Sequence, residues 1–300
     1  MPEVTSQPRY LRFSVSDRVE HWVQVFVFTG LAITGLVQKW AEGWLSKAII
    51  GALGGINTTR LIHHSLAAMV LVATVYHIGT AGYRFFVLRM GREMLPGLDD
   101  ARAAVQTVAF RLGLRSDPPR QGKFTFDEKM EYWSIIWGTI LMVVTGLMMW
   151  NPISTTRLLP GEFIPAAKAV HGGEAILAVL AILVWHTYHV HLRHLNRSMF
   201  DGYLTEEEML EEHPAQLAEI KAGAPPVPPV PPEVLRKRRK AFFTAYGAFT
   251  VAFAIVVVVF LTYEQVAIKT IPPPASPVQI YVPYTPPAES GQTAPSSTVP

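Results

Sequence analysis

The sequence predicts an all-α membrane protein, a four-helix transmembrane bundle followed by one additional C-terminal transmembrane helix. Three observations support this fold class. Half of the 300 residues are hydrophobic and only 16% are charged, whereas a soluble chain usually carries about 25% charged residues. The apolar residues gather in runs, and several runs reach the roughly 20 residues that a helix needs to cross a bilayer. Lys and Arg lie mainly in alternate connections between these runs.

Five runs are long enough to span a membrane. The first four contain His, Gly, Thr and Trp, which is typical of helices that pack against one another. The fifth is apolar on all sides and rich in β-branched residues, so we expect it to face lipid. Ser16 and Asp17 are suitable N-cap residues for the first helix. The predicted spans cover residues 18–37, 61–83, 130–150, 169–192 and 242–263.

The chain divides into four regions by composition. The bundle and its cytoplasmic loop come first, followed by a Pro-rich and basic linker, the fifth helix and a tail rich in Pro and Ser. The boundaries are 1–215, 216–240, 241–264 and 265–300. We also expect three further helical segments outside the membrane: two with an apolar face, for the membrane surface, and an acidic one. They cover residues 93–115, 42–55 and 204–221.

The basic residues predict the orientation of the chain. Segments 1–18, 84–129 and 193–240 hold 20 of the 26 Lys and Arg residues, and short loops rich in these residues stay cytoplasmic. The N-terminus is therefore expected inside a bacterial inner membrane and the C-terminal tail outside. Contact with anionic membrane lipid accounts for the basic segments, so nucleic acid is not an expected partner.

A repeat relates the first and third predicted helices. Glu20-His21-Trp22 is followed, twelve residues after the Trp, by Thr34-Gly35-Leu36. Glu131-Tyr132-Trp133 is followed at the same interval by Thr145-Gly146-Leu147. The second and fourth helices each carry a His near their beginning. This pattern predicts two related helix hairpins.

Histidines are concentrated in the bundle, where an ionisable group is costly and functional by default. His63 and His77 are 14 residues apart, which places them nearly on one helix face and about 21 Å apart along the axis. His171 and His186 have similar spacing in a helix that runs the same way. The sequence therefore predicts facing His residues at two levels, and His21 also reaches the inner level.

Two levels of paired imidazoles suit two stacked bis-His haems of the electron-transfer type. A zinc site would instead gather its ligands at one depth. His21 and His77 both remain candidates for the inner level, and His189 is a weaker alternative to His186. His191, His194 and His213 are interpreted as residues of the membrane interface.

At these residues the chain resembles the gamma subunit of membrane formate dehydrogenases and the b-type cytochrome subunit of membrane hydrogenases. The resemblance covers about residues 10–215 and combines four helices with their His residues in order. The matching pieces are Asp17-Arg18…His21-Trp22, Arg60-Leu61-Ile62-His63, Lys129-Met130…Trp133-Ser134…Val144-Thr145-Gly146, His171 and His186-Thr187-Tyr188.

The resemblance implies two haem b groups. It assigns His63 and His171 to the outer haem and His21 and His186 to the inner haem, which favours His21 over His77. It also implies a quinone, menaquinone or ubiquinone, beside the inner haem at residues 124–129. The small polar Asn and Gly usual in this segment are replaced by Thr125 and Asp127, which are candidates for quinone contact or, equally, for capping the third helix.

The expected function is electron transfer between a redox partner on the outer side and the quinone pool of a respiratory or photosynthetic complex. The chain has no Cys, so it cannot itself hold iron–sulfur clusters or covalently attached haem. The partner is expected to be an iron–sulfur subunit or a multihaem cytochrome c, because the acidic run 201–214 also resembles family members that work with multihaem cytochromes. Two alternatives are a partner-independent transmembrane haem reductase and a non-redox membrane scaffold or transporter.

Overall fold

The computed structural model describes residues 8–90, 92–117, 119, 121–193, 195–223 and 230–262. It is almost entirely helical, and five helical segments are long and apolar enough to cross a membrane. The fold class and all five spans are therefore confirmed. The segments are α1 (Val15–Lys39), α3 (Ile56–Gly82) continued by η1 (Tyr83–Val87), α5 (Phe126–Trp150), α7 (Phe163–Leu180) continued by η3 (Ala181–His186) and η4 (Tyr188–Arg193), and α11 (Pro232–Thr262).

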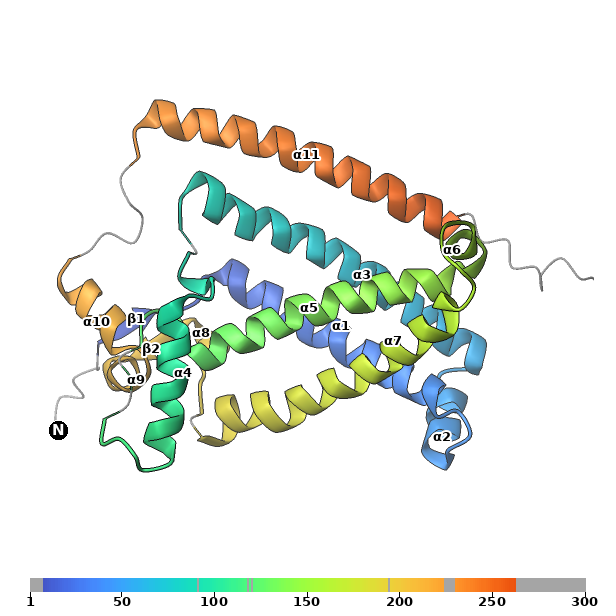
Figure 1. Ribbon diagram of the computed structural model, residues 1–300, viewed down its shortest axis with the longest axis horizontal. Coiled ribbons are helices and arrows are strands. Elements are labelled where there is room, and N and C mark those ends of the chain that lie inside the picture. Colours follow the sequence, from blue (N-terminus) through green and yellow to red (C-terminus); the bar gives the residue numbers. More distant parts are fainter. Residues whose placement is uncertain are drawn as a thin grey trace, which may run out of the picture. The chain divides into compact units, whose positions relative to one another are not determined.

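The four bundle helices form two hairpins (Figure 1). α1 packs along α3, α5 packs along α7, and α1 also contacts α7. Short helices connect the members of each hairpin at one end of the bundle, namely α2 (Trp44–Ala52) and α6 (Pro152–Leu158). We call this the outer end, and the end at which α1 begins the inner end, after the orientation that the basic residues predict. The connection between the hairpins contains η2 (Arg92–Met94) and α4 (Leu98–Arg111), which contacts α5.

Capping boxes start α1 and α5. Ser14 is the N-cap of α1: its hydroxyl accepts from the Asp17 backbone N–H at 3.3 Å, and the Asp17 carboxylate accepts from the Ser14 N–H at 3.0 Å. The expectation of a cap at Ser16 and Asp17 was wrong by one turn, because Asp17 occupies the third helical position and completes the box from inside the helix. Thr125 and Glu128 form the same arrangement at α5.

A small folded layer covers the inner end of the bundle. We call it the inner cap: residues 8–14, 121–128 and 198–221. Strand β1 (Arg9–Leu11) pairs antiparallel with β2 (Tyr203–Thr205), with Tyr10 opposite Leu204. α8 (Ser198–Asp201), α9 (Glu206–Glu212) and α10 (Pro214–Lys221) complete it. Leu204, Met209 and Leu217 form its apolar core, against which Tyr10 packs.

The acidic run of the inner cap is paired within the chain. Asp201 forms an ion pair with Arg9, and Glu206 pairs with Lys221. The backbone N–H of Tyr203, followed by the Arg9 guanidinium, lowers the pKa of Asp201. These two carboxylates of the run therefore help to hold the inner cap together.

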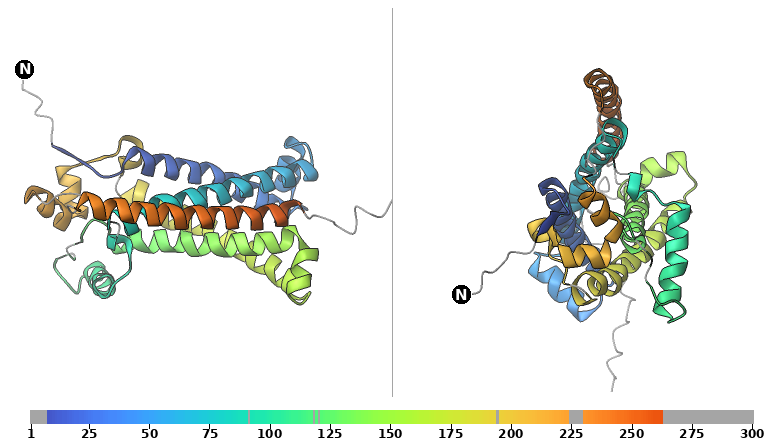
Figure 2. Two further views of the ribbon diagram at one scale, coloured as in Figure 1. Left: turned by 90° about the horizontal axis from the view of Figure 1, so that it is seen from above. Right: turned by 90° about the vertical axis from the view of Figure 1, so that its left-hand side faces the viewer.

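The fifth span lies alongside the second (Figures 1 and 2). α11 contacts η1, and the Tyr246 hydroxyl donates to the Val75 carbonyl of α3 at 2.9 Å. Gly79 permits this approach, because a Cβ there would lie 2.6 Å from the Tyr246 hydroxyl. Part of α11 therefore faces α3 as well as lipid. Residues 224–229 of the predicted linker, His194 and the tail from residue 263 lie outside the described residues.

Candidate haem sites

His63 of α3 and His171 of α7 form a facing pair toward the outer end. Their ring centroids are 6.5 Å apart, with an angle of 72° between the ring planes. We call them the outer pair. Two imidazole nitrogens that each lie about 2 Å from one shared metal place their ring centroids roughly 6 Å apart. The spacing of the outer pair fits a single iron between the two rings.

Each ring of the outer pair is held by a threonine of the repeat. Thr34 Oγ1 lies 2.9 Å from His63 Nδ1, and Thr145 Oγ1 lies 2.9 Å from His171 Nδ1. Each hydroxyl already donates to a carbonyl one turn earlier, at Gly30 and Leu141. The threonine oxygen must therefore accept from Nδ1–H, which leaves Nε2 with its lone pair. This is the tautomer that a ligand to iron requires.

The glycine after each threonine makes room for the same ring. A Cβ added at Gly35 would lie 3.2 Å from Cε1 of His63, and one at Gly146 would lie 3.3 Å from Cε1 of His171. The Thr-Gly step thus provides an acceptor and a close backbone surface to one imidazole in each hairpin. In the structure, the Thr-Gly step of the predicted repeat supports a histidine ring in each hairpin. The spacing of the repeat in the sequence did not indicate this role.

His21 of α1 and His186 of η3 form a second facing pair near the inner end. Their ring centroids are 6.4 Å apart, with 35° between the planes. Glu131 Oε2 lies 3.2 Å from His186 Nδ1 and orients that ring. His21 Nδ1 is buried and has no hydrogen-bond partner among the described residues. This inner pair also has the spacing of two imidazoles that share one metal.

His77 belongs to a different set of contacts. Its Nδ1 lies 2.8 Å from Glu20 Oε2, and its Nε2 lies 3.0 Å from the Tyr132 hydroxyl. Both ring nitrogens are occupied by hydrogen bonds, whereas a ligand needs one nitrogen with a lone pair directed at the metal. The geometry therefore favours His21 over His77 at the inner level.

The two candidates at the start of α5 have defined local partners. The Thr125 hydroxyl accepts from the Glu128 N–H at 3.2 Å, so this side chain is the N-cap of the helix. The Asp127 carboxylate accepts from the Arg111 guanidinium at 3.0 Å, and its side chain is 19% exposed. Both side chains lie at the inner end, but neither belongs to the paired histidines.

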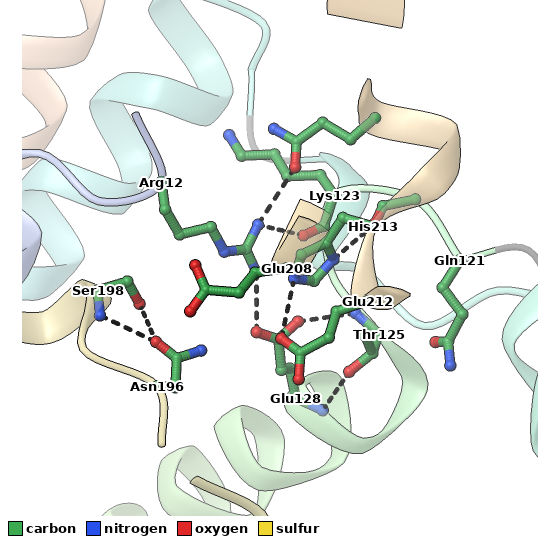
Figure 3. A network of polar contacts seen from close by, with 12 residues as sticks. Arg12, Gln121, Lys123, Thr125, Glu128, Asn196, Ser198, Glu208, Glu212 and His213 are labelled. Carbon is green, nitrogen blue, oxygen red and sulfur yellow. Dashed lines mark hydrogen bonds and ion pairs between the residues drawn. The ribbon is translucent and has the colours of Figure 1, made fainter. Parts of the chain in front are cut away.

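A polar network in the inner cap was not anticipated (Figure 3). The Arg12 side chain is 1% exposed, donates to Glu128 at 2.8 Å and also donates to the Lys123 carbonyl. His213 donates from Nδ1 to the Gly122 carbonyl at 3.1 Å. Its placement at the membrane interface was wrong, because the ring is 1% exposed inside the cap. Burial, and then the nearby positive charge of Arg12, lower the pKa of His213.

Of the remaining described histidines, His191 also contacts His186, with ring centroids 6.1 Å apart and 84° between the planes. His64 stacks on Trp150 at 3.8 Å between ring centroids. His189 donates from Nδ1 to the Trp185 carbonyl at 2.9 Å, and it is half-buried. The described residues contain no cluster of three or more His, Asp or Glu side chains able to hold a metal ion. The metal-binding options in this part of the chain are therefore pairs, as bis-imidazole haem ligation requires.

The chain belongs to the prokaryotic cytochrome b561 family, whose model matches residues 12–202. It is therefore a multi-pass membrane cytochrome b of the bacterial inner membrane that binds haem b and transfers electrons. This membership excludes the alternative of a non-redox scaffold or transporter.

Characterised relatives agree with the family. The chain is 22% identical over 212 residues to the cytochrome b556(Fdn) subunit of the nitrate-inducible formate dehydrogenase of Escherichia coli K12, covering 70% of this chain and 91% of the relative. It is 23% identical to the cytochrome b556 subunit of the formate dehydrogenase of Haemophilus influenzae, covering 71% and 84% respectively. The match to the family model ends at residue 202, before α11 begins.

Proposed function

We propose that this chain is a di-haem subunit that moves electrons between a redox partner at the outer end and a quinone at the inner end. The observation that carries the proposal is the presence of two facing His pairs with ring centroids 6.5 Å and 6.4 Å apart. They lie at different depths of the same bundle, because His171 and His186 are 15 residues apart along one helical segment, or about 20 Å.

The outer haem would be held by His63 and His171, and the inner haem by His21 and His186. When bound by two imidazoles, haem b supplies reversible one-electron chemistry with no open position for a substrate. Thr34 and Thr145 keep the Nε2 lone pairs of the outer ligands directed at the iron. Glu131 does the same for His186.

The quinone, menaquinone or ubiquinone, would bind beside the inner haem near the first turns of α5. The Thr125 hydroxyl is committed to capping that helix, so we propose that it shapes the site through the helix start. We also propose that Asp127 makes a polar contact with the quinone while its carboxylate stays paired with Arg111. With the inner end at the cytoplasm, quinone protons would exchange with the cytoplasm.

The partner would be an iron–sulfur subunit of an oxidoreductase complex at the outer end. The relatives are named as cytochrome subunits of formate dehydrogenases, and this chain has no Cys with which to hold a cluster of its own. The comparisons lend no support to a multihaem cytochrome c as the partner. α2 and α6, which lie at the outer end, are the surfaces where such a partner would approach the outer pair.

The test uses the haem-loaded full chain in liposomes that contain a naphthoquinol or an ubiquinol. We expect quinol to reduce the b haems, and an impermeant oxidant on the outer side to reoxidise them. Haems that dithionite reduces but neither quinol reduces would contradict the proposal. Fast electron transfer from the dithionite-reduced haems to a soluble ferric chelate, in the absence of both quinone and partner, would instead support the partner-independent reductase.

A further inference from the structure

Glu20, His77 and Tyr132 form a hydrogen-bonded chain across three helices that the haem sites do not use. Glu20 is on α1, His77 on α3 and Tyr132 on α5. The distances are 2.8 Å from Glu20 Oε2 to His77 Nδ1 and 3.0 Å from His77 Nε2 to the Tyr132 hydroxyl. An ionisable cluster inside a span is costly unless it has a function.

The internal repeat places this chain at the depth of the inner pair. Tyr132 occupies the position of His21 in the second copy, between Glu131 and Trp133 as His21 lies between Glu20 and Trp22. The acidic residues of the two copies also act alike, because Glu20 contacts His77 and Glu131 contacts His186. The first hairpin and the second thus contribute a carboxylate–imidazole pair each, and only one of the two imidazoles faces another histidine.

The direction of the hydrogen bonds follows from the chemistry of the groups. A carboxylate only accepts, so Glu20 accepts from His77 Nδ1–H, and the Thr80 hydroxyl donates to its other oxygen at 3.1 Å. His77 Nε2 then carries a lone pair and accepts from the Tyr132 O–H. The Tyr132 oxygen keeps acceptor capacity for a further donor. This is the order of a general base that is oriented by a carboxylate.

Tyr132 also lies next to the segment where the proposed function places the quinone. It follows Lys129 by three residues, so the two side chains are neighbours on one face of α5 and Tyr132 is one turn deeper. At the Glu20 end of the hydrogen-bonded series, Ser16 Oγ lies 3.4 Å from Glu20 Oε1 and 3.3 Å from the Tyr76 hydroxyl. These groups extend the polar path to the first turn of α1 at the inner end.

We propose that Tyr132 and His77, oriented by Glu20, transfer one of the two protons of the quinone reaction, an inference that rests on the proposed function. In quinol oxidation, one quinol O–H bond breaks and its proton passes to the Tyr132 oxygen as the Tyr132 proton passes to His77 Nε2. The two electrons would be accepted one at a time by a haem held by His21 and His186, and the second proton goes to water at the inner surface. Quinone reduction follows the same path in reverse, with the imidazolium of His77 as the proton source.

The test compares Tyr132→Phe, His77→Gln and a control, Tyr246→Phe, in the haem-loaded full chain. The control removes a phenol that also bonds to α3, at Val75. Positioned proton transfer contributes about 10²–10⁴-fold to a rate, so we expect quinol-driven haem reduction to slow at least 10²-fold in the first two variants. Their haem content, quinol KM and reduction by dithionite should match the wild type, and the control should be unchanged.

Two further readouts separate proton transfer from a structural role. The wild type should show a solvent isotope effect on the rate of haem reduction by quinol. The size of this effect should change in both Tyr132→Phe and His77→Gln. Infrared difference spectra of ring-labelled tyrosine should show a change on quinol addition that Tyr132→Phe removes. Haem reduction by quinol at the wild-type rate in both folded variants would overturn the inference. Failure of quinol to reduce the wild type would overturn the proposed function instead.

Discussion

The threonine supports of the outer pair give a prediction whose size follows from the structure. Thr34→Val and Thr145→Val keep the shape of the side chain and remove the acceptor 2.9 Å from Nδ1 of His63 and of His171, respectively. Without that acceptor the imidazole is free to carry its proton on Nε2, the nitrogen that must face the iron. Each substitution should therefore weaken the outer haem and leave the inner haem unaffected.

The expected magnitude comes from two independent considerations. A buried donor left without a partner costs about 1–3 kcal/mol. Loss of a group that orients a metal ligand typically lowers affinity about 10–100-fold, which corresponds to roughly 1.4–2.8 kcal/mol. We therefore expect each variant to raise the Kd of the outer haem about 10–100-fold. The double variant should weaken it about 10²–10⁴-fold if the two effects add.

The assay is haem transfer from the purified variants to an apoprotein acceptor, followed by haem quantitation per chain. The inner haem serves as an internal reference in the same sample. Thr58→Val is the matched control, because the Thr58 hydroxyl donates to the Gly54 carbonyl of its own turn, at 3.2 Å, and not to a histidine. Retention of both haems with wild-type affinity in Thr34→Val and Thr145→Val would refute the supporting role of the two threonines.

Three other perturbations have defined outcomes. Gly35→Leu should displace the His63 ring, because the new Cβ would lie 3.2 Å from its Cε1, and haem quantitation should show loss of the outer haem alone. Gly51 has open space around it, so Gly51→Leu should keep both haems. Arg12→Met removes a buried donor to Glu128 and should destabilise the inner cap by about 1.5–3 kcal/mol, seen as faster hydrogen exchange in β2 and α9. Because burial lowers the pKa of His213 below its ordinary value of 6.5, the unfolded cap takes up a proton before the folded cap as the pH falls. Cap stability should therefore decline below about pH 6.5, and hydrogen exchange should show no such decline in His213→Gln.

The sequence was most informative about the membrane-spanning segments. Apolar runs alone identify all five spans, because length and composition decide whether a helix can cross a bilayer. The shared direction of the second and fourth helices, with a His near the start of each, also predicted that His63 and His171 lie at one level. It was less informative for His186, since residues 181–186 form a π-helix, whose wider turns change the face that a residue occupies.

The contacts that orient the rings could not be read from the sequence. The Thr-Gly repeat was visible, but its bond to a histidine on the partner helix depends on how α1 meets α3 and how α5 meets α7. Likewise, His21 and His77 were both suitable by depth. The contacts in the folded chain distinguish them, because Glu20 and Tyr132 occupy both ring nitrogens of His77. The inner cap depends on pairing between residues nearly 200 positions apart.

Haem quantitation in single histidine variants tests the central claim most directly. The purified full chain should contain two haem b groups by pyridine haemochrome assay, with one lost in His63→Ala or His171→Ala. The other should be lost in His21→Ala or His186→Ala, and both should remain in His77→Ala. Loss of a haem in His77→Ala with retention in His21→Ala would contradict the inner ligand pair, and a single haem in the wild-type chain would contradict the two-level arrangement.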